Sequence, residues 1–229
     1  MTGLPLQARI LLMVGMFEGS KNGTINVWDE QFLSVGTLQY AVKGGSGVRF
    51  LARIRQIDPE GFMHCLGTDF TRATVAGPEA LREYCRTQVW KQLDRWQPAF
   101  RNLAQLPAYA QADSECAKWY LDSGMQIAEH YGLTSERGLA FAVDRVVQQG
   151  GKTRSEVELA VKKLGKGTPE WQVMKVLALA YAATALPQYA GVVRARALTV
   201  ATGSSKGTGY PGKVDLELDY GLSPTVAWE

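Results

Sequence analysis

Two carboxylates near the N-terminus have the surroundings that acid–base chemistry requires. Glu18 ends an apolar segment, Leu6–Phe17, that we expect to be helical. Apolar neighbours and the negative end of a helix both favour the protonated form of a carboxyl, so Glu18 suits a general acid. Asp29 follows 11 residues later among polar side chains, which should keep it ionised as a general base. Ser34 lies five residues further on and offers a hydroxyl to hold a water molecule.

Hydrolysis of a glycosidic bond requires at least one carboxyl group that acts as acid and one that acts as base, here on separate secondary-structure elements. The acid protonates the leaving oxygen while the base activates a water molecule on the other side of the sugar. A glutamate at a helix end and an aspartate in a hairpin also occur in many proteins with no such role. The spacing alone leaves both interpretations open.

The elements expected to position these residues are a small β structure within a mostly helical chain. Residues 24–42 are rich in β-branched and aromatic residues and predict a twisted hairpin or three short strands. Glycines at 44–47 predict a turn before a helix that starts near Val48. The rest of the chain predicts helices over 78–97 (interrupted by Pro98), 108–131, 134–150, 155–164, 169–186 and 189–202, followed by an irregular end that closes with 214–220. We expect one domain over residues 1–229, with two lobes.

The segment from Glu18 to Gln39, with its S-x-G-x-L-Q motif at 34–39, resembles the chitosanase-like branch of the lysozyme-like superfamily. In that family the general acid is a glutamate that ends the N-terminal helix. An aspartate followed five residues later by a threonine provides the base and the water holder. The resemblance therefore implies Glu18 as acid, Asp29 as base and Ser34 in place of the threonine. The loop between acid and base is shorter here than in chitosanases, which leaves Glu30 as the alternative base.

A second match is the segment 138–151, which resembles the central helix of the family with its aspartate, here Asp144. In the family this aspartate joins an ion-pair network that reaches the catalytic glutamate, and Arg194 and Arg196 match the arginine pair of that network. A buried Asp144 needs such a partner. The resemblance spans residues 8–222. It implies a mainly α (α+β) lysozyme-like fold, with helical lobes and a hairpin beside a substrate cleft, and inversion at the anomeric carbon.

Aromatic and amide side chains around the hairpin are candidates for contacts with sugar rings. Trp28 and Tyr40 bracket the hairpin, where they would either stack on sugars or pack the hairpin against the helices. Asn26 and Gln39 would hydrogen-bond sugar hydroxyl or N-acetyl groups, and the superfamily places a glutamine at the foot of its cleft. The other tryptophans are expected in the core; they are Trp90, Trp96, Trp119 and Trp171.

Composition narrows the choice of polymer. Lys and Arg number 25 against 22 Asp and Glu, for a net charge of +3, and neither a dense basic stripe nor an acidic run is present. This argues against a nucleic-acid partner. It suits the carboxylate-bearing peptidoglycan strand better than polycationic chitosan. We therefore predict a muramidase-like hydrolase of β-1,4 bonds, with cell-wall degradation and an antibacterial role. A chitosanase, a lytic transglycosylase that uses Glu18 alone, and a non-catalytic glycan-binding module are the alternatives.

The remaining expectations concern location and cofactors. The apolar run at 10–17 is short, is preceded by Pro5 and is followed by no small-residue cleavage site, so no signal peptide is expected. The apolar run at 173–185 contains Lys175 and is too short to span a membrane. We expect synthesis in the cytoplasm without a leader, and action in the periplasm or on the cell wall after delivery. A delivery system and an immunity protein would then be the protein partners. The three cysteines and two histidines show no ligand spacing, so no metal or other cofactor is expected.

Overall fold

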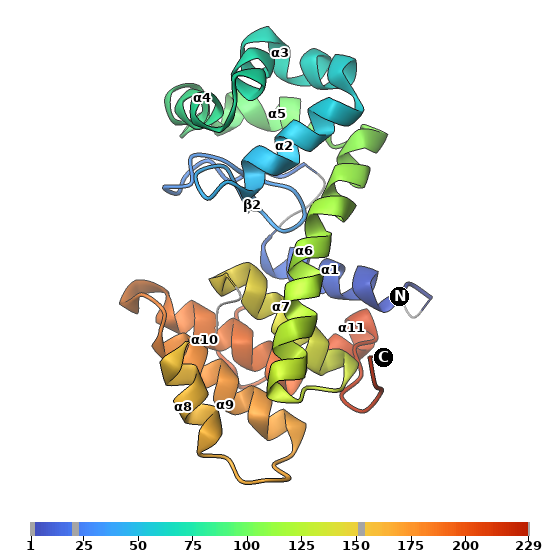
Figure 1. Cartoon of the computed structure of the whole chain (residues 1–229), viewed down its shortest axis with the longest axis vertical. Helices are drawn as coiled ribbons and strands as arrows, with labels where there is room; N and C mark the ends of the chain where they lie inside the picture. The colour runs from blue at the N-terminus through green and yellow to red at the C-terminus, as the bar shows by residue number, and fades with distance from the viewer. Residues whose placement is uncertain (1–2, 20–22, 151–153, 229) are drawn as a thin grey trace. The chain divides into compact units, whose positions relative to one another are not determined.

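The computed structural model describes residues 3–19, 23–150 and 154–228, which are mainly helical (Figure 1). The chain divides into two compact units. Unit 1 combines the residues up to Val14 with those from Tyr120 onward, and unit 2 runs from Gly15 to Trp119. No helix among the described residues is long and apolar enough to cross a membrane.

Unit 2 begins with the end of α1 (Leu6–Phe17), whose bounds coincide with the predicted helix. A two-stranded antiparallel sheet follows, and the rest of the unit is helical. The strands are β1 (Ser34–Val35) and β2 (Tyr40–Ala41), and the helices are α2 (Ser46–Ile57), α3 (Pro59–Ala76), α4 (Pro78–Tyr84), the π-helical η1 (Cys85–Val89), α5 (Leu93–Leu103) and the first part of α6 (Pro107–Tyr131).

The hairpin is held by one tight turn and by two hydrogen bonds to Asp113. Gly36 has a φ of 89°, and a Cβ at this position would lie 2.4 Å from the ring of Tyr40, so both the conformation and the space require glycine. The Thr37 N–H donates to Asp113 Oδ1 of α6 (3.1 Å), and the Tyr40 hydroxyl donates to the Asp113 carbonyl (3.2 Å). Burial raises the pKa of Asp113 above its usual range. α6 thus fixes the turn that joins the two strands.

The prediction of one helix over 78–97, interrupted at Pro98, is wrong about the position of the break. The helical run ends at Val89, and Lys91 has a left-handed φ of 62°. α5 then starts at Leu93 and continues through Pro98. Pro98 is the sixth residue of α5, so the hydrogen bond that an amide at this position would donate to the Asp94 carbonyl is missing, yet the helix continues to Leu103. The break places Trp96 so that its indole N–H donates to the Gln88 carbonyl (2.8 Å).

The core of unit 2 is aromatic. Phe70 lies at its centre, with ring centroids of neighbouring side chains 5.4–6.1 Å away at steep angles, an arrangement that aromatic pairs favour. A second group joins the hairpin to α2 and α6. Here the Phe50 ring lies 4.9 Å from Tyr40 and 5.0 Å from Tyr109. The hairpin is therefore anchored through Tyr40.

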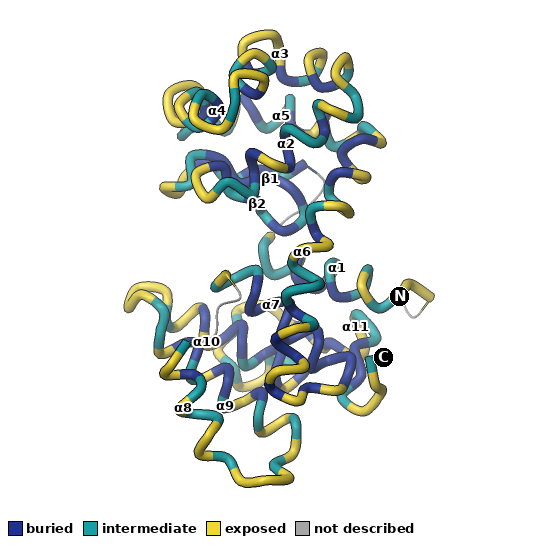
Figure 2. Tube along the Cα trace, in the orientation of Figure 1, coloured by how far each residue is buried: buried dark blue, intermediate teal, exposed yellow. Residues whose placement is uncertain are grey.

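Unit 1 is built around α7 (Glu136–Gln149), which is buried from its first residue to Val146 (Figure 2). Ser135 caps this helix by accepting a hydrogen bond from the Gly138 N–H, and Gly150 ends it in the left-handed conformation. α7 packs against α9 and α10. The remaining helices of unit 1 are α8 (Ser155–Lys162), α9 (Glu170–Ala183), α10 (Pro187–Thr202) and α11 (Leu216–Tyr220).

Glu136, the first residue of α7, accepts hydrogen bonds from residues near the N-terminus and near the C-terminus. Arg9 of α1 donates to both carboxylate oxygens of Glu136 (2.6 and 3.2 Å), and the Ser223 N–H donates to Glu136 Oε2 (3.2 Å). Burial disfavours the charged form of Glu136, but Arg9 and the Ser223 amide outweigh it and hold its pKa below the usual range.

This pair predicts how stability changes in acid. Because the pKa of Glu136 is lower in the folded state, the unfolded chain takes up its proton first, and the free energy of unfolding should fall as pH drops below about 4.3. Urea unfolding between pH 6 and pH 2.5 measures this loss. Glu136→Gln should lower stability at pH 6 and reduce the slope of the acid limb. An unchanged slope would show that Glu136 does not contribute.

Candidate active site

Glu18 lies in the turn that directly follows α1 and is half-buried. The Gly19 N–H donates to the Met16 carbonyl (3.1 Å), and the left-handed φ of Gly19 ends the helix at this point. The carboxyl thus stands at the negative end of the α1 dipole, next to Met16 and Phe17. This is the position that the sequence predicts for the acid.

Asp29 lies in an exposed turn just before β1, and its carboxylate is held from two sides. Asn26 Nδ2 donates to Asp29 Oδ2 (3.0 Å), and the Gln31 N–H donates to Asp29 Oδ1 (2.9 Å). The Trp28 N–H in turn donates to Asn26 Oδ1 (3.0 Å). Both functional atoms of Asn26 therefore serve the turn. The arrangement leaves the carboxylate of Asp29 open to solvent but fixed in direction.

Ser34 lies on β1, between two hydrogen-bonded neighbours. It pairs with Ala41 on one side and forms a bridge with Asn26 on the other, where the two N–H groups donate at 2.8 and 2.9 Å. The residue is only 4% exposed. Asn26 thus connects the two candidates, because its backbone pairs with Ser34 and its side chain holds Asp29.

Two of the predicted sugar contacts have structural roles instead. Tyr40 is 1% exposed, and its hydroxyl reaches the Asp113 carbonyl, so it packs the hairpin and does not stack on a sugar. Asn26 is committed to the Asp29 turn. Gln39 is half-buried, and its Nε2 donates to the carbonyls of Thr24 (3.2 Å) and Gly36 (3.3 Å). Its carboxamide oxygen has no hydrogen-bond partner among the residues that the structure describes and is the group left for a ligand.

Trp28 is 62% exposed, next to Asp29, and is the aromatic side chain of this turn that a sugar ring can reach. The expectation that the other tryptophans lie in the core is wrong for two of them. Trp119 and Trp171 lie on helix surfaces and are more than half exposed, whereas Trp96 is buried as predicted. Trp90 is half-buried, directly after η1.

The role of Asn26 can be tested by its removal. Asn26→Ala should lower kcat about tenfold, because Asp29 loses one of its two fixed hydrogen bonds. KM should stay within about twofold, since Asn26 positions the base and does not contact substrate. Gln31→Ala is the matched control, because Gln31 holds Asp29 through its backbone only. A rise in KM with unchanged kcat would instead place Asn26 in substrate binding.

Glu30, the alternative base, has a different environment. Its side chain is 88% exposed, and its carboxylate lies 3.6 Å from Lys43 Nζ. No hydrogen bond that would fix its direction is present in the described part of the chain. Asp29 is therefore the better oriented of the two carboxylates.

The predicted ion-pair network lies in unit 1 and is buried. Arg196 of α10 donates to Asp144 Oδ1 of α7 through Nε (2.9 Å) and Nη2 (2.6 Å). The neighbouring Arg145 donates to Asp144 Oδ2 and, more weakly, to Gln149 Oε1 (3.4 Å). Although burial disfavours the charged form, these guanidinium groups hold the pKa of Asp144 below its usual range.

Arg194 does not belong to this network. It is exposed on α10 and has no ion pair among the residues that the structure describes. Residues two apart point to opposite sides of a helix, so only one of Arg194 and Arg196 can reach Asp144. Sequence reasoning also missed Arg145, which is fully buried. An Asp–Arg pair inside an otherwise apolar helix was the available signal.

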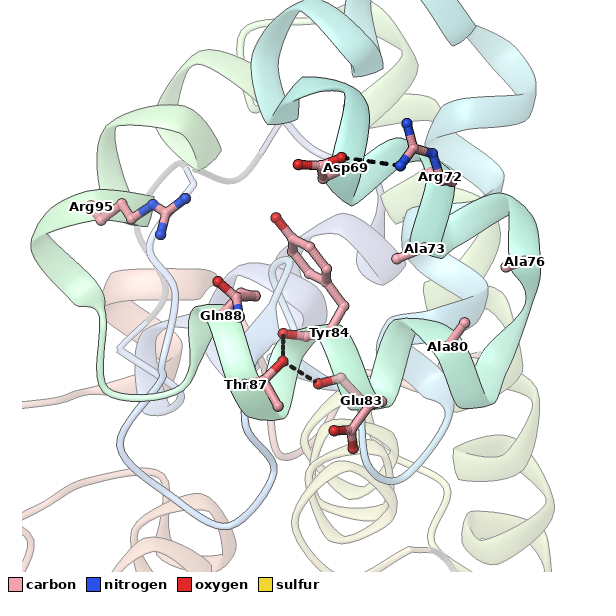
Figure 3. Close-up of a pocket in the computed structure, with 10 residues that line it drawn as sticks. All are labelled: Asp69, Arg72, Ala73, Ala76, Ala80, Glu83, Tyr84, Thr87, Gln88 and Arg95. Atoms are coloured by element: carbon pink, nitrogen blue, oxygen red, sulfur yellow. Dashed lines mark hydrogen bonds and ion pairs between the residues drawn. The ribbon is translucent and has the colours of Figure 1, made fainter.

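Unit 2 also has an open pocket of about 600 Å³ between α3, α4, η1 and α5, and the Tyr84 ring is directed into it (Figure 3). Its polar lining includes Asp69, which pairs with Arg72 (3.4 Å). None of the predicted site residues lines this pocket. The site on the hairpin and this pocket are therefore separate features.

No protein-family model and no curated protein sequence matches the chain. Solved structures do match. One is the chitosanase GsCsn46A of Gynuella sunshinyii in complex with chitotetraose, with a TM-score of 0.65 and 14% identity over 91% of this chain and 93% of that chain. The fold is that of the GH46 chitosanases. A second match is the native chitosanase of Bacillus subtilis MY002, with a TM-score of 0.65 and 13% identity over 95% of this chain and 91% of that one.

A mutant of the same Bacillus enzyme, complexed with 6 GlcN, matches equally well. The mainly α, lysozyme-like GH46 fold with a small hairpin is thus confirmed. At 13–14% identity the likeness concerns the fold. The activity of this chain has to be argued from its own residues.

Proposed function

We propose that this chain is a glycoside hydrolase, with Glu18 as general acid and Asp29 as general base. The observation that carries the proposal is the pairing of the GH46 fold with two carboxylates of unlike environment in one compact unit. One is half-buried at a helix end, and the other is exposed and oriented by Asn26.

In the proposed reaction Glu18 gives its proton to the glycosidic oxygen as the bond from that oxygen to the anomeric carbon breaks. Asp29 takes a proton from a water molecule whose oxygen bonds to the anomeric carbon from the opposite face. The hydroxyl of Ser34, beside Asn26 on the same ladder, holds that water. Each turnover leaves Glu18 ionised and Asp29 protonated, and exchange with solvent restores both. This chemistry inverts the anomeric configuration.

The proposed substrate is the glycan strand of peptidoglycan, cleaved at its β-1,4 bonds. The net charge of +3 supports an anionic polymer over a polycation. Chitosan is the second candidate, because the structures with the same fold are chitosanases. An enzyme of cell-wall degradation would act in the periplasm or on the wall, with an antibacterial effect.

Release of reducing ends from purified peptidoglycan sacculi, chitosan and neutral chitin oligomers tests this proposal. We expect new reducing ends from sacculi at a higher kcat/KM than from chitosan. A preference for chitosan would move the chain to the second candidate. Products with anhydro-sugar ends would indicate a lytic transglycosylase. Binding without any product would indicate a glycan-binding module.

A further inference from the structure

Four side chains form a continuous row beside the Asp29 turn, which we call the cation–aromatic row. Lys43 Nζ lies 5.5 Å from the centre of the Phe32 ring, and the Phe32 ring packs edge-on against Trp90 at 5.6 Å. Lys91 Nζ lies 4.5 Å from the centre of the Trp90 ring. Two ammonium groups thus flank two rings that pack edge to face.

The backbone fixes two members of this row, Phe32 and Lys91. Phe32 and Lys91 are two of the three non-glycine residues with positive φ in the described chain, at 66° and 62°. Such conformations are unfavourable for residues with a Cβ and persist where surrounding contacts enforce them, often at functional sites. The Lys91 N–H donates to the Val27 carbonyl (2.8 Å), which ties the row to the segment that leads into Asp29.

The ammonium groups are held but not neutralised. Both lysines are exposed, and contact with an aromatic face restricts a flexible lysine head without removing its charge. Within the described part of the chain, Lys43 pairs with one carboxylate, that of Glu30 at 3.6 Å, in a solvent-exposed pair of the kind that contributes little. No carboxylate lies within ion-pair distance of Lys91 among the described residues. The row therefore presents oriented positive charge next to the proposed base.

We propose that the cation–aromatic row is a subsite for the carboxylate groups that substituents such as stem peptides carry on a glycan strand. It would select peptide-bearing, anionic glycans and repel the protonated amines of chitosan. The inference rests on the proposed function for the position of the glycan, because it places the row alongside the sugar bound at Asp29. Restricted ammonium groups lose less freedom when they bind an anion, which favours such a role.

Charge reversal at both lysines tests the row. The double variant Lys43→Glu, Lys91→Glu should lose about tenfold in kcat/KM on sacculi, equivalent to two modest surface charge interactions. It should stay within about twofold on neutral chitin oligomers. Lys43→Gln, Lys91→Gln should show a smaller loss in the same direction. The double variant Arg72→Glu, Arg86→Glu makes the same total change of charge at two exposed ion pairs, on α3 and η1, and is the control. Thermal unfolding verifies that each variant folds.

Binding to sacculi, measured by co-sedimentation at low and high salt, separates this inference from the proposed function. Weaker binding of the double variant at low salt supports the row, even if the wild-type chain releases no product and the hydrolase proposal fails. If the wild type hydrolyses sacculi and the double variant keeps the same ratio of kcat/KM on sacculi to kcat/KM on chitin oligomers, the subsite proposal alone is overturned. A wild-type chain that neither binds nor cleaves sacculi overturns both the proposed subsite and peptidoglycan as the substrate, and activity on chitosan then decides whether the hydrolase proposal stands.

Discussion

Glu18→Gln is expected to lower kcat by about 10²- to 10⁴-fold on the preferred polymer, the range that a positioned general acid contributes. Glutamine keeps the shape of the side chain but has no proton to give to the glycosidic oxygen. Because the amide still fits the site, KM and the binding of sacculi should change little. Initial rates of reducing-end release over a range of substrate concentrations separate the two parameters.

The matched control for this variant is Glu60→Gln, the same substitution at an exposed glutamate in the first turn of α3. It should retain wild-type kcat. Asp29→Asn should also lose activity, since the water is then not deprotonated. A greater loss in Glu30→Gln than in Asp29→Asn would transfer the base role to Glu30. Full activity of Glu18→Gln would remove the general-acid assignment.

Asp144→Asn is expected to lower the free energy of unfolding by about 3–5 kcal/mol, the usual cost of breaking a buried ion pair from one side. The substitution leaves the guanidinium groups of Arg145 and Arg196 buried without their counter-charge. Denaturant unfolding, with the change read from the midpoint at constant slope, measures this loss. Destabilisation should be evident near neutral pH, where Asp144 is ionised in the wild type.

Glu115→Gln provides the comparison. Glu115 also pairs with an arginine through two hydrogen bonds, at 2.6 and 3.0 Å from Arg53, but on the surface. Its loss should cost no more than about 1 kcal/mol. Adding Arg196→Met to Asp144→Asn should restore part of the lost stability, because one unpaired buried charge is removed as well. Equal losses of unfolding free energy in Asp144→Asn and Glu115→Gln would show that burial of the Asp144 ion pairs does not increase their contribution to stability.

Local patterns predicted the helices well where start and stop signals are close in sequence. Ser135 caps α7 and Gly150 ends it, and the apolar run at 6–17 forms α1. The break at Lys91 was missed because Pro98 is a stronger local signal than a lysine in a left-handed conformation. That conformation depends on the hydrogen bond from Lys91 to Val27, which is far away in sequence.

In the candidate site, too, features that depend on contacts between distant residues could not be predicted from the sequence. Asn26 and Asp29 are three residues apart, so the turn that joins them is visible in the sequence, although the amide of Asn26 on its own predicts sugar binding. The burial of Tyr40 depends on Phe50 and α6, and the row from Lys43 to Lys91 joins segments that are distant in the chain. Tertiary contacts determine where these side chains lie, and the periodicity of the sequence does not reveal such contacts.

The stereochemistry of the first product tests the two-carboxylate account most directly. Proton NMR of a soluble β-1,4-linked substrate during early turnover, before mutarotation, reports the configuration at the new reducing end. The account predicts the α-anomer, because a water activated by Asp29 attacks opposite the leaving oxygen that Glu18 protonates. A β-anomer as first product would contradict it, since retention requires a carboxylate that attacks the sugar itself.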